Sequence, residues 1–190
     1  IVWLYLGNKG KDKRMRNKFK MMTVAITIFM MITALAGCGT SSKSVKGESF
    51  DGGNIEVFVP EGWKAFHGPD TFDDYEEGYD PNIVNIGKGV ELEVELFSKP
   101  MVNIHYSGDK SLIMPTKEIY EDGKDLEDIK TGDYTWKGFT GLSIGYPIAI
   151  LFTEFDDKQI QVSITLENGD SKISLEDEDV LAILEGIKIK

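Results

Sequence analysis

Alternation of apolar and polar side chains is the feature that most constrains how this chain folds. In residues 90–96, four apolar side chains alternate with Glu91, Glu93 and Glu95. In residues 158–166, four more alternate with polar side chains. A period of two is typical of a β-strand with one buried face, and burial of that face fixes the register of the strand. The sequence therefore predicts an antiparallel sheet with one face against a core and the other in water.

Turn signals divide the rest of this sheet into further strands. A turn at residues 60–62 predicts a hairpin, and Asp156-Asp157 joins a long second hairpin that we expect at the centre of the sheet. Residues 68–82 have no period and predict a loop. The expected strands are residues 55–60, 63–66, 83–86, 90–96, 101–106, 134–139, 146–155 and 158–166.

Two helical segments complete an α+β fold. Residues 116–121 favour a short helix that ends at Gly123. A second helix is expected after Ser174, whose hydroxyl can cap it, and Asp177 completes a weak capping box three residues on. Gly186 is expected to end that helix.

Charge separates the first 37 residues from the rest. Seven of the 21 basic residues and one of the 32 acidic residues lie in residues 1–37. Residues 38–190 keep 14 basic residues, all of them lysine, against 31 acidic ones, which is a net charge of −17. A domain without arginine has no planar fork that binds phosphate in two places, and its negative field repels a nucleic-acid backbone. Nucleic acid is therefore excluded as the expected partner.

The lone cysteine of the chain lies at the end of an apolar run. Residues 21–36 carry no charge and follow a basic segment that begins after a plausible start at Met15, and Leu35-Ala36-Gly37-Cys38 closes the run. This pattern resembles the lipobox of bacterial lipoproteins. The resemblance implies cleavage before Cys38, a diacylglyceryl group on its thiol, and attachment to the extracytoplasmic face of a membrane. An uncleaved membrane helix fits less well, because a span needs about 20 apolar residues.

These features predict three parts in the chain. Residues 1–37 are expected to be a signal peptide preceded by an upstream segment, in which residues 1–14 have no structural role. Residues 38–53 are small and polar, which is typical of a lipidated cysteine followed by a flexible tether. Residues 54–190 have the length of one domain and should form a single core.

Motifs at the two ends of this domain resemble those of the PsbP-like family. They are Val57-Phe58-Val59-Pro60-x-Gly62-Trp63 and Asp179-Val180-x-x-Ile183-Leu184-x-Gly186-Ile187-Lys188. The resemblance implies an antiparallel sheet flanked by helices, an α/β/α sandwich. It also implies a binding or assembly accessory without catalysis, whose partner is an unidentified protein or another component of the cell envelope.

Acidic and aromatic side chains are interleaved in one segment, which we expect to be the binding loop if the domain has one. The residues are Asp70, Phe72, Asp73, Asp74, Tyr75, Glu76, Glu77, Tyr79 and Asp80. Such carboxylates could gather around Ca²⁺, but they lack the order of an EF-hand, so a solvated acidic loop is favoured. The rings could form a platform for sugars, peptides or cationic groups, although aromatic side chains that pin the loop to the sheet are the favoured interpretation.

Catalytic motifs are missing from the sequence. His67 and His105 have no neighbouring nucleophile or third metal ligand in a known pattern, and we expect both to be ordinary surface or boundary residues. The domain is therefore not expected to be an enzyme, and no catalytic residue, metal ligand or obligatory cofactor is assigned. The alternatives left open are a carboxylate-based hydrolase of cell-envelope glycans and a calcium-binding surface module.

Overall fold

Antiparallel strands make up most of the computed structural model of this 190-residue chain, which describes residues 45–69 and 78–190. Residues 45–190 form one unit. Its elements are β1 (Gly47–Asp51), β2 (Ile55–Pro60), β3 (Trp63–Pro69), β4 (Tyr79–Lys88), η1 (Glu93–Ser98), β5 (Met101–Ser107), η2 (Lys117–Ile119), β6 (Glu121–Asp125), β7 (Ile129–Thr131), β8 (Tyr134–Ser143), β9 (Tyr146–Phe155), β10 (Lys158–Thr165), β11 (Glu167–Asn168), β12 (Ser171–Lys172), α2 (Glu178–Glu185) and β13 (Lys188–Ile189).

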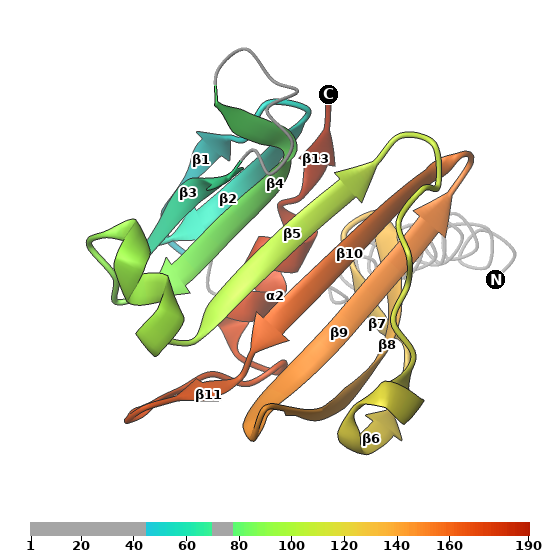
Figure 1. Cartoon of the computed structure of the whole chain (residues 1–190). Coiled ribbons are helices and arrows are strands. Elements are labelled where there is room, and N and C mark those ends of the chain that lie inside the picture. Colours follow the sequence, from blue (N-terminus) through green and yellow to red (C-terminus); the bar gives the residue numbers. More distant parts are fainter. Residues whose placement is uncertain (1–44, 70–77) are drawn as a thin grey trace, which may run out of the picture. The chain divides into compact units, whose positions relative to one another are not determined.

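A large antiparallel sheet forms the main layer, with the strand order β3-β4-β5-β10-β9-β8-β6 and β7 paired to β8 (Figure 1). The long hairpin predicted from the alternation is confirmed as β9 and β10, and it lies in the middle of this order. Ile160, Val162 and Ile164 are buried, as their spacing predicts. The period of two therefore determines which face of β10 lies against the core.

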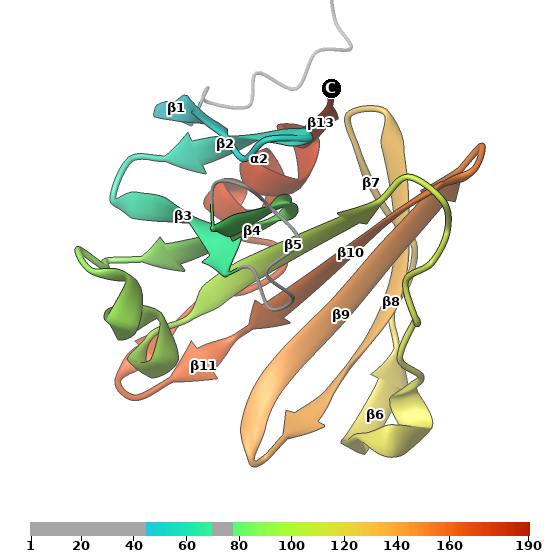
Figure 2. The ribbon, with the colours of Figure 1, turned by 45° about the horizontal axis from the view of Figure 1, so that its top comes forward.

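A small sheet and one helix cover a single face of the large sheet (Figures 1 and 2). The small sheet has the order β1-β2-β13, and α2 packs on β2. The shared core takes its fully buried side chains from three sources: the inner faces of the large-sheet strands, β2 and α2. Within residues 45–69 and 78–190, no helix has the length and apolar character that crossing a membrane requires.

Helix α2 begins later than the sequence predicted. Its N-cap is Asp177 instead of Ser174, and the Asp177 carboxylate accepts a hydrogen bond from the Ser174 backbone N–H at 3.0 Å. Asp177 thus supplies one half of a capping box around a turn that precedes the helix, while the Ser174 hydroxyl accepts from the Glu176 N–H at 3.3 Å. Gly186 ends α2 as predicted, because its N–H donates to the carbonyl groups of Ala182 and Ile183.

The flexible tether predicted for residues 39–53 does not extend that far, because a strand begins within it. Residues 47–51 form β1, which pairs with β2 and places Phe50 against the core. Phe50 also contacts the ring of His67, with centroids 4.9 Å apart. One apolar side chain and antiparallel pairing with β2 along residues 47–51 hold a segment whose polar composition indicated flexibility.

The predicted hairpin of residues 55–66 is wrong, because its two strands belong to different sheets. β2 pairs with β1 and β13, whereas β3, which follows the turn at Glu61 and Gly62, pairs with β4. The predicted loop of residues 68–82 is also shorter, since β3 extends to Pro69 and β4 starts at Tyr79.

The strongest predicted strand, residues 90–96, is not a strand. The segment after Lys88 turns at Gly89, which has a φ of 64°, and then forms the 3₁₀ helix η1. The chain must reverse here because β4 and β5 are antiparallel neighbours. Of the four alternating apolar side chains, Val90 and Leu96 are buried, while Leu92 and Val94 are 63% and 68% exposed.

Helices flank the sheet less than the predicted sandwich requires. Among the described residues α2 is the one α-helix, and the helix expected at residues 116–121 is the single 3₁₀ turn η2. The outer face of the large sheet is covered near β8 by Tyr120, whose ring lies 5.4 Å from that of Phe139, and near β4 by η1. The α+β class thus holds, with mostly antiparallel sheet and few helices.

Candidate functional site

Most of the predicted binding loop lies outside the described residues, as does Cys38. Seven of the nine candidate residues of that loop lie outside the described ranges: Asp70, Phe72, Asp73, Asp74, Tyr75, Glu76 and Glu77. The other two begin β4. Tyr79 stacks on His67 with ring centroids 4.0 Å apart, and Asp80 accepts a hydrogen bond from the Asn82 N–H at 2.8 Å. The calcium prediction for this segment stays a prediction, although residues 45–69 and 78–190 contain no group of three potential metal ligands.

The connection from β4 to β5 builds a different candidate site. Its fold depends on Glu95, whose carboxylate accepts hydrogen bonds from the backbone N–H groups of Glu91 (2.6 Å) and Leu92 (2.9 Å). The bond from Leu92, followed by the bond from Glu91, lowers the pKa of the Glu95 carboxyl below its ordinary value. Glu95 thereby holds the start of η1 in its turned conformation.

Leu96 fixes η1 onto the outer face of β4. Its Cδ2 atom would lie 2.6 Å from a Cβ placed on Gly87, so the missing side chain of Gly87 makes room for it. Leu96 is 6% exposed. A small residue in the strand therefore lets an apolar side chain from the connection rest directly on the sheet.

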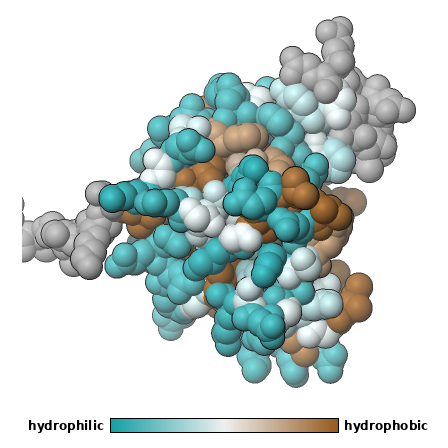
Figure 3. Space-filling view, turned by 90° about the vertical axis from the view of Figure 1, so that its left-hand side faces the viewer, coloured by the Kyte–Doolittle hydropathy of each residue, from teal (hydrophilic) through white to brown (hydrophobic). Residues whose placement is uncertain are grey.

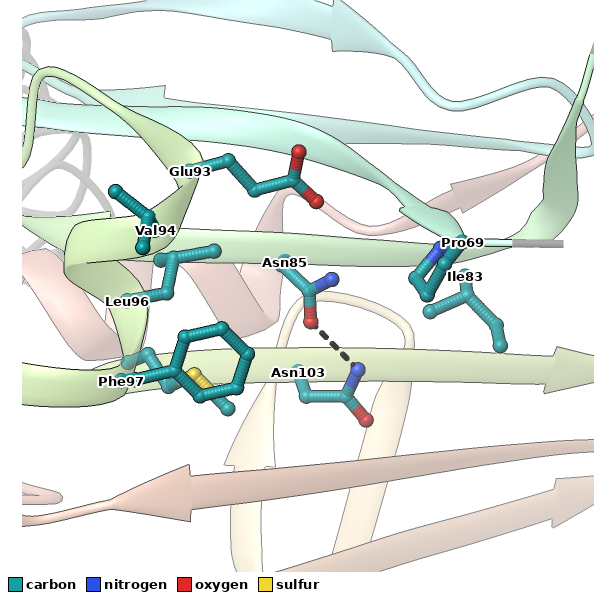
Figure 4. A pocket seen from close by; sticks show the side chains of 9 residues that line it. Pro69, Ile83, Asn85, Glu93, Val94, Leu96, Phe97 and Asn103 are labelled. Carbon is teal, nitrogen blue, oxygen red and sulfur yellow. Dashed lines mark hydrogen bonds between the residues drawn. The ribbon is translucent and has the colours of Figure 1, made fainter. Parts of the chain in front are cut away.

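An apolar hollow of about 480 Å³ opens between η1 and the strands (Figure 4). Side chains from η1 form one wall, β4 and β5 form the floor, and the end of β3 lies opposite. The lining residues are Pro69, Ile83, Asn85, Glu93, Val94, Leu96, Phe97, Met101 and Asn103. Phe97 is 86% exposed, so a large ring stands beside the hollow with little protein around it. On the face that carries η1, apolar patches interrupt a mainly hydrophilic surface (Figure 3).

Two asparagines supply polar groups in the floor of the hollow. Asn85 of β4 lies opposite Asn103 of β5 in the register, and Asn103 Nδ2 donates to Asn85 Oδ1 at 2.8 Å. In Figure 4 the nitrogen of Asn85 is directed toward Pro69, and the oxygen of Asn103 is directed away from Asn85, at the other end of the hydrogen-bonded pair. The hollow thus combines apolar walls with a donor and an acceptor at the two ends of the asparagine pair, the composition of a binding pocket.

His105 lies next to the hollow on the same outer face, opposite Ile83 in the register. Burial lowers the pKa of His105 below its ordinary value, and the Asp80 carboxylate opposes that shift in part. His67 lies between the rings of Phe50 and Tyr79, and its buried Nδ1 has no hydrogen-bond partner among the described residues.

Sequence reasoning missed this hollow because it assigned residues 90–96 to a strand. In that interpretation Leu92 and Val94 face the core and Phe97 is an unremarkable end residue. One feature of the sequence indicated a turn instead of a strand after residue 88. Gly87 and Gly89 flank Lys88, and two glycines near a strand end are typical of a turn or of a close approach of the backbone.

Comparisons with known proteins show distant structural likeness. No family model matches the sequence, and no curated protein matches it. The chain is similar to a protein from Bacteroides thetaiotaomicron VPI-5482, with a TM-score of 0.42 and 11% identity over 76% of this chain and 48% of that one. It is also similar to PsbP (CyanoP) of Synechocystis sp. PCC 6803, with a TM-score of 0.40 and 11% identity over 81% and 98% of the two chains.

The chain spans about half the length of the Bacteroides protein. The second likeness is to a member of the family that the two end motifs resemble. A TM-score below 0.5 supports no argument about activity, partners or detailed topology. The fold described above therefore rests on the strand order and the core.

Proposed function

We propose that this chain is a membrane-anchored, non-catalytic accessory protein that docks a protein partner through the hollow under η1. The observation that carries the proposal is the exposure of Leu92, Val94 and Phe97 around an apolar hollow. Exposed apolar side chains that gather at a concave surface are typical of interaction sites. The lipobox-like sequence at Cys38 supports the membrane anchor.

The partner's docking segment is expected to be apolar with basic residues beside it. The charged residue among the nine that line the hollow is Glu93, and Glu91 stands exposed nearby. With a net charge of −17 on residues 38–190, the surface favours a cationic segment and repels an anionic one. An anionic lipid surface or a nucleic acid therefore fits this site less well than a basic, apolar peptide segment.

The docking proposal is tested by changing the exposed apolar side chains together. The variant Leu92→Ser/Val94→Ser/Phe97→Ser should keep the fold, because the three side chains are largely solvent-exposed. A matched control is Ile113→Ser, since Ile113 is 93% exposed and lies in a different segment. A photocrosslinking amino acid at position 101, which lines the hollow and is unchanged in the triple variant, should capture a partner in native membranes and give no product when the triple variant carries it.

The control variant should keep the crosslink. Equal crosslinking yields in the wild type and in a triple variant whose circular dichroism is unchanged would refute docking through the hollow. The anchor is tested separately, by mass spectrometry of protein taken from the native membrane. We expect a chain that starts at Cys38 with acyl mass attached, and an unmodified thiol in a longer chain would contradict the anchor.

A further inference from the structure

We propose that Asn85 and Asn103 recognise the backbone amide groups of an extended peptide segment docked in the hollow. This inference rests on the proposed function and names the chemical class of its ligand. The two side chains lie opposite each other on β4 and β5 and are joined by one hydrogen bond of 2.8 Å. Both face the apolar hollow (Figure 4).

The single bond leaves hydrogen-bonding capacity on both amides. A carboxamide has two N–H donors and an oxygen acceptor with two lone pairs. Asn103 uses one N–H and Asn85 uses its oxygen, so both N–H groups of Asn85 and the oxygen of Asn103 remain for an occupant. These groups lie at the two ends of the hydrogen-bonded pair, the Asn85 nitrogen on the side of Pro69 and the Asn103 oxygen at the opposite end.

An occupant that is wholly apolar fits this floor poorly. Both asparagines are half-buried, and covering them with apolar groups would remove water from donors and acceptors without replacing its hydrogen bonds. The occupant therefore needs an acceptor for Asn85 and a donor for Asn103, together with an apolar group that fills the space against Val94, Leu96 and Phe97.

A residue in an extended peptide meets this requirement. Its N–H and its C=O point to the same side, as when opposite residues of an antiparallel ladder exchange both bonds. The C=O would accept from Asn85 Nδ2 and the N–H would donate to Asn103 Oδ1. Its apolar side chain, or that of a neighbour, would fill the hollow, and an adjacent lysine or arginine would lie near the Glu93 carboxylate.

The test compares two short peptides that differ in a single backbone atom. The probe is acetyl-Lys-Leu-Lys-amide, and its partner is the depsipeptide in which an ester oxygen replaces the leucine N–H. Binding to residues 39–190 is followed by the side-chain NH₂ resonances of Asn85 and Asn103 in NMR titrations. We expect the amide peptide to shift these resonances and to bind roughly tenfold more tightly than the ester, because one net hydrogen bond is lost.

Two variants separate amide recognition from docking. Asn85→Leu/Asn103→Leu replaces the pair by apolar side chains of similar size, and with this protein the two peptides should bind equally. Gln161→Leu, a change on the same outer face in β10 and outside the lining of the hollow, should keep the tenfold preference.

Each outcome of the titration decides a specific point. Equal binding of both peptides to the wild type, with shifts confined to the hollow, would overturn amide recognition and leave docking intact. Titration with no shift at the hollow for either peptide would also overturn it, and the crosslinking experiment then decides docking by itself. A preference that persists in the double leucine variant would place the recognised amide contact elsewhere.

Discussion

Leu96→Ala and Val94→Ala should differ sharply in their effect on stability, although both positions belong to the same alternating pattern. Leu96 is 6% exposed and rests on Gly87, so its truncation removes buried methyl groups and leaves a cavity. Leucine-to-alanine changes in such places cost about 2–5 kcal/mol, and the lower half of that range is expected because η1 can partly settle onto the strand. Val94 is 68% exposed and makes few contacts to lose, so its truncation should cost about 0.5 kcal/mol or less.

Thermal unfolding of residues 39–190 without the lipid anchor measures this difference. At about 3–4 °C per kcal/mol for a domain of this size, Leu96→Ala should lower Tm by roughly 6–14 °C and Val94→Ala by roughly 2 °C at most. Urea unfolding provides an independent free energy, with the slope unchanged if the unfolded state is the same. Equal losses at the two positions would mean that residues 90–96 form a strand with both side chains against a core, and would refute the 3₁₀ turn.

Three further predictions concern other parts of the fold. Trp63→Phe removes an indole N–H that donates to the Asp179 carboxylate at 3.0 Å, and this should cost about 2 kcal/mol in urea unfolding. In the double variant this loss should not add to the loss caused by Asp179→Asn. Two losses that add in full would contradict the hydrogen bond. Burial lowers the pKa of His105 in the folded protein below its ordinary value of 6.5, so the free energy of unfolding should be constant above pH 6.5 and decrease as the pH falls below it. His105→Asn should flatten this part of the plot of stability against pH. An unchanged plot would contradict the burial of His105. Ile144→Asn should raise stability by about 1 kcal/mol, because Ile144 is 95% exposed at a φ of 52° that asparagine tolerates better; a lower Tm would show that Ile144 makes a stabilising contact.

Local pattern predicted the parts of the fold in which burial acts along a single strand. β2, β5 and β10 all follow from alternation, since each has one face against the core. Which strand pairs with which depends on contacts between distant residues, and this is why the hairpin expected at residues 55–66 is wrong. β2 reaches β13 at the far end of the sequence, through a pairing of Glu56 with Lys188 that no local turn signal reports.

Residues 90–96 show the limit of the alternation argument most directly. A period of two shows that a segment has a side-chain pattern compatible with a strand. It does not show whether the fold places another strand beside that segment for it to pair with. The connection from β4 to β5 occupies residues 89–100, far more than the two to five residues that a hairpin of adjacent antiparallel strands needs. The excess length of this connection could be recognised only once the pairing of β4 with β5 was known, because the sequence does not show that these two strands are neighbours.

This surplus length is also the reason to connect the hollow with function. The core face of the large sheet is already covered by β2 and α2, so Leu92, Val94 and Phe97 contribute little to the core. A shorter turn would join β4 to β5 without exposing three apolar side chains and without covering two asparagines on the outer face. Folding alone therefore gives no reason for η1 to carry these residues, whereas a bound segment that covers them supplies one. Shortening residues 91–98 to a tight turn removes Leu96 from the sheet, so it should lower Tm by no more than Leu96→Ala does while abolishing the crosslink. A much larger fall in Tm would show that the connection serves the fold instead.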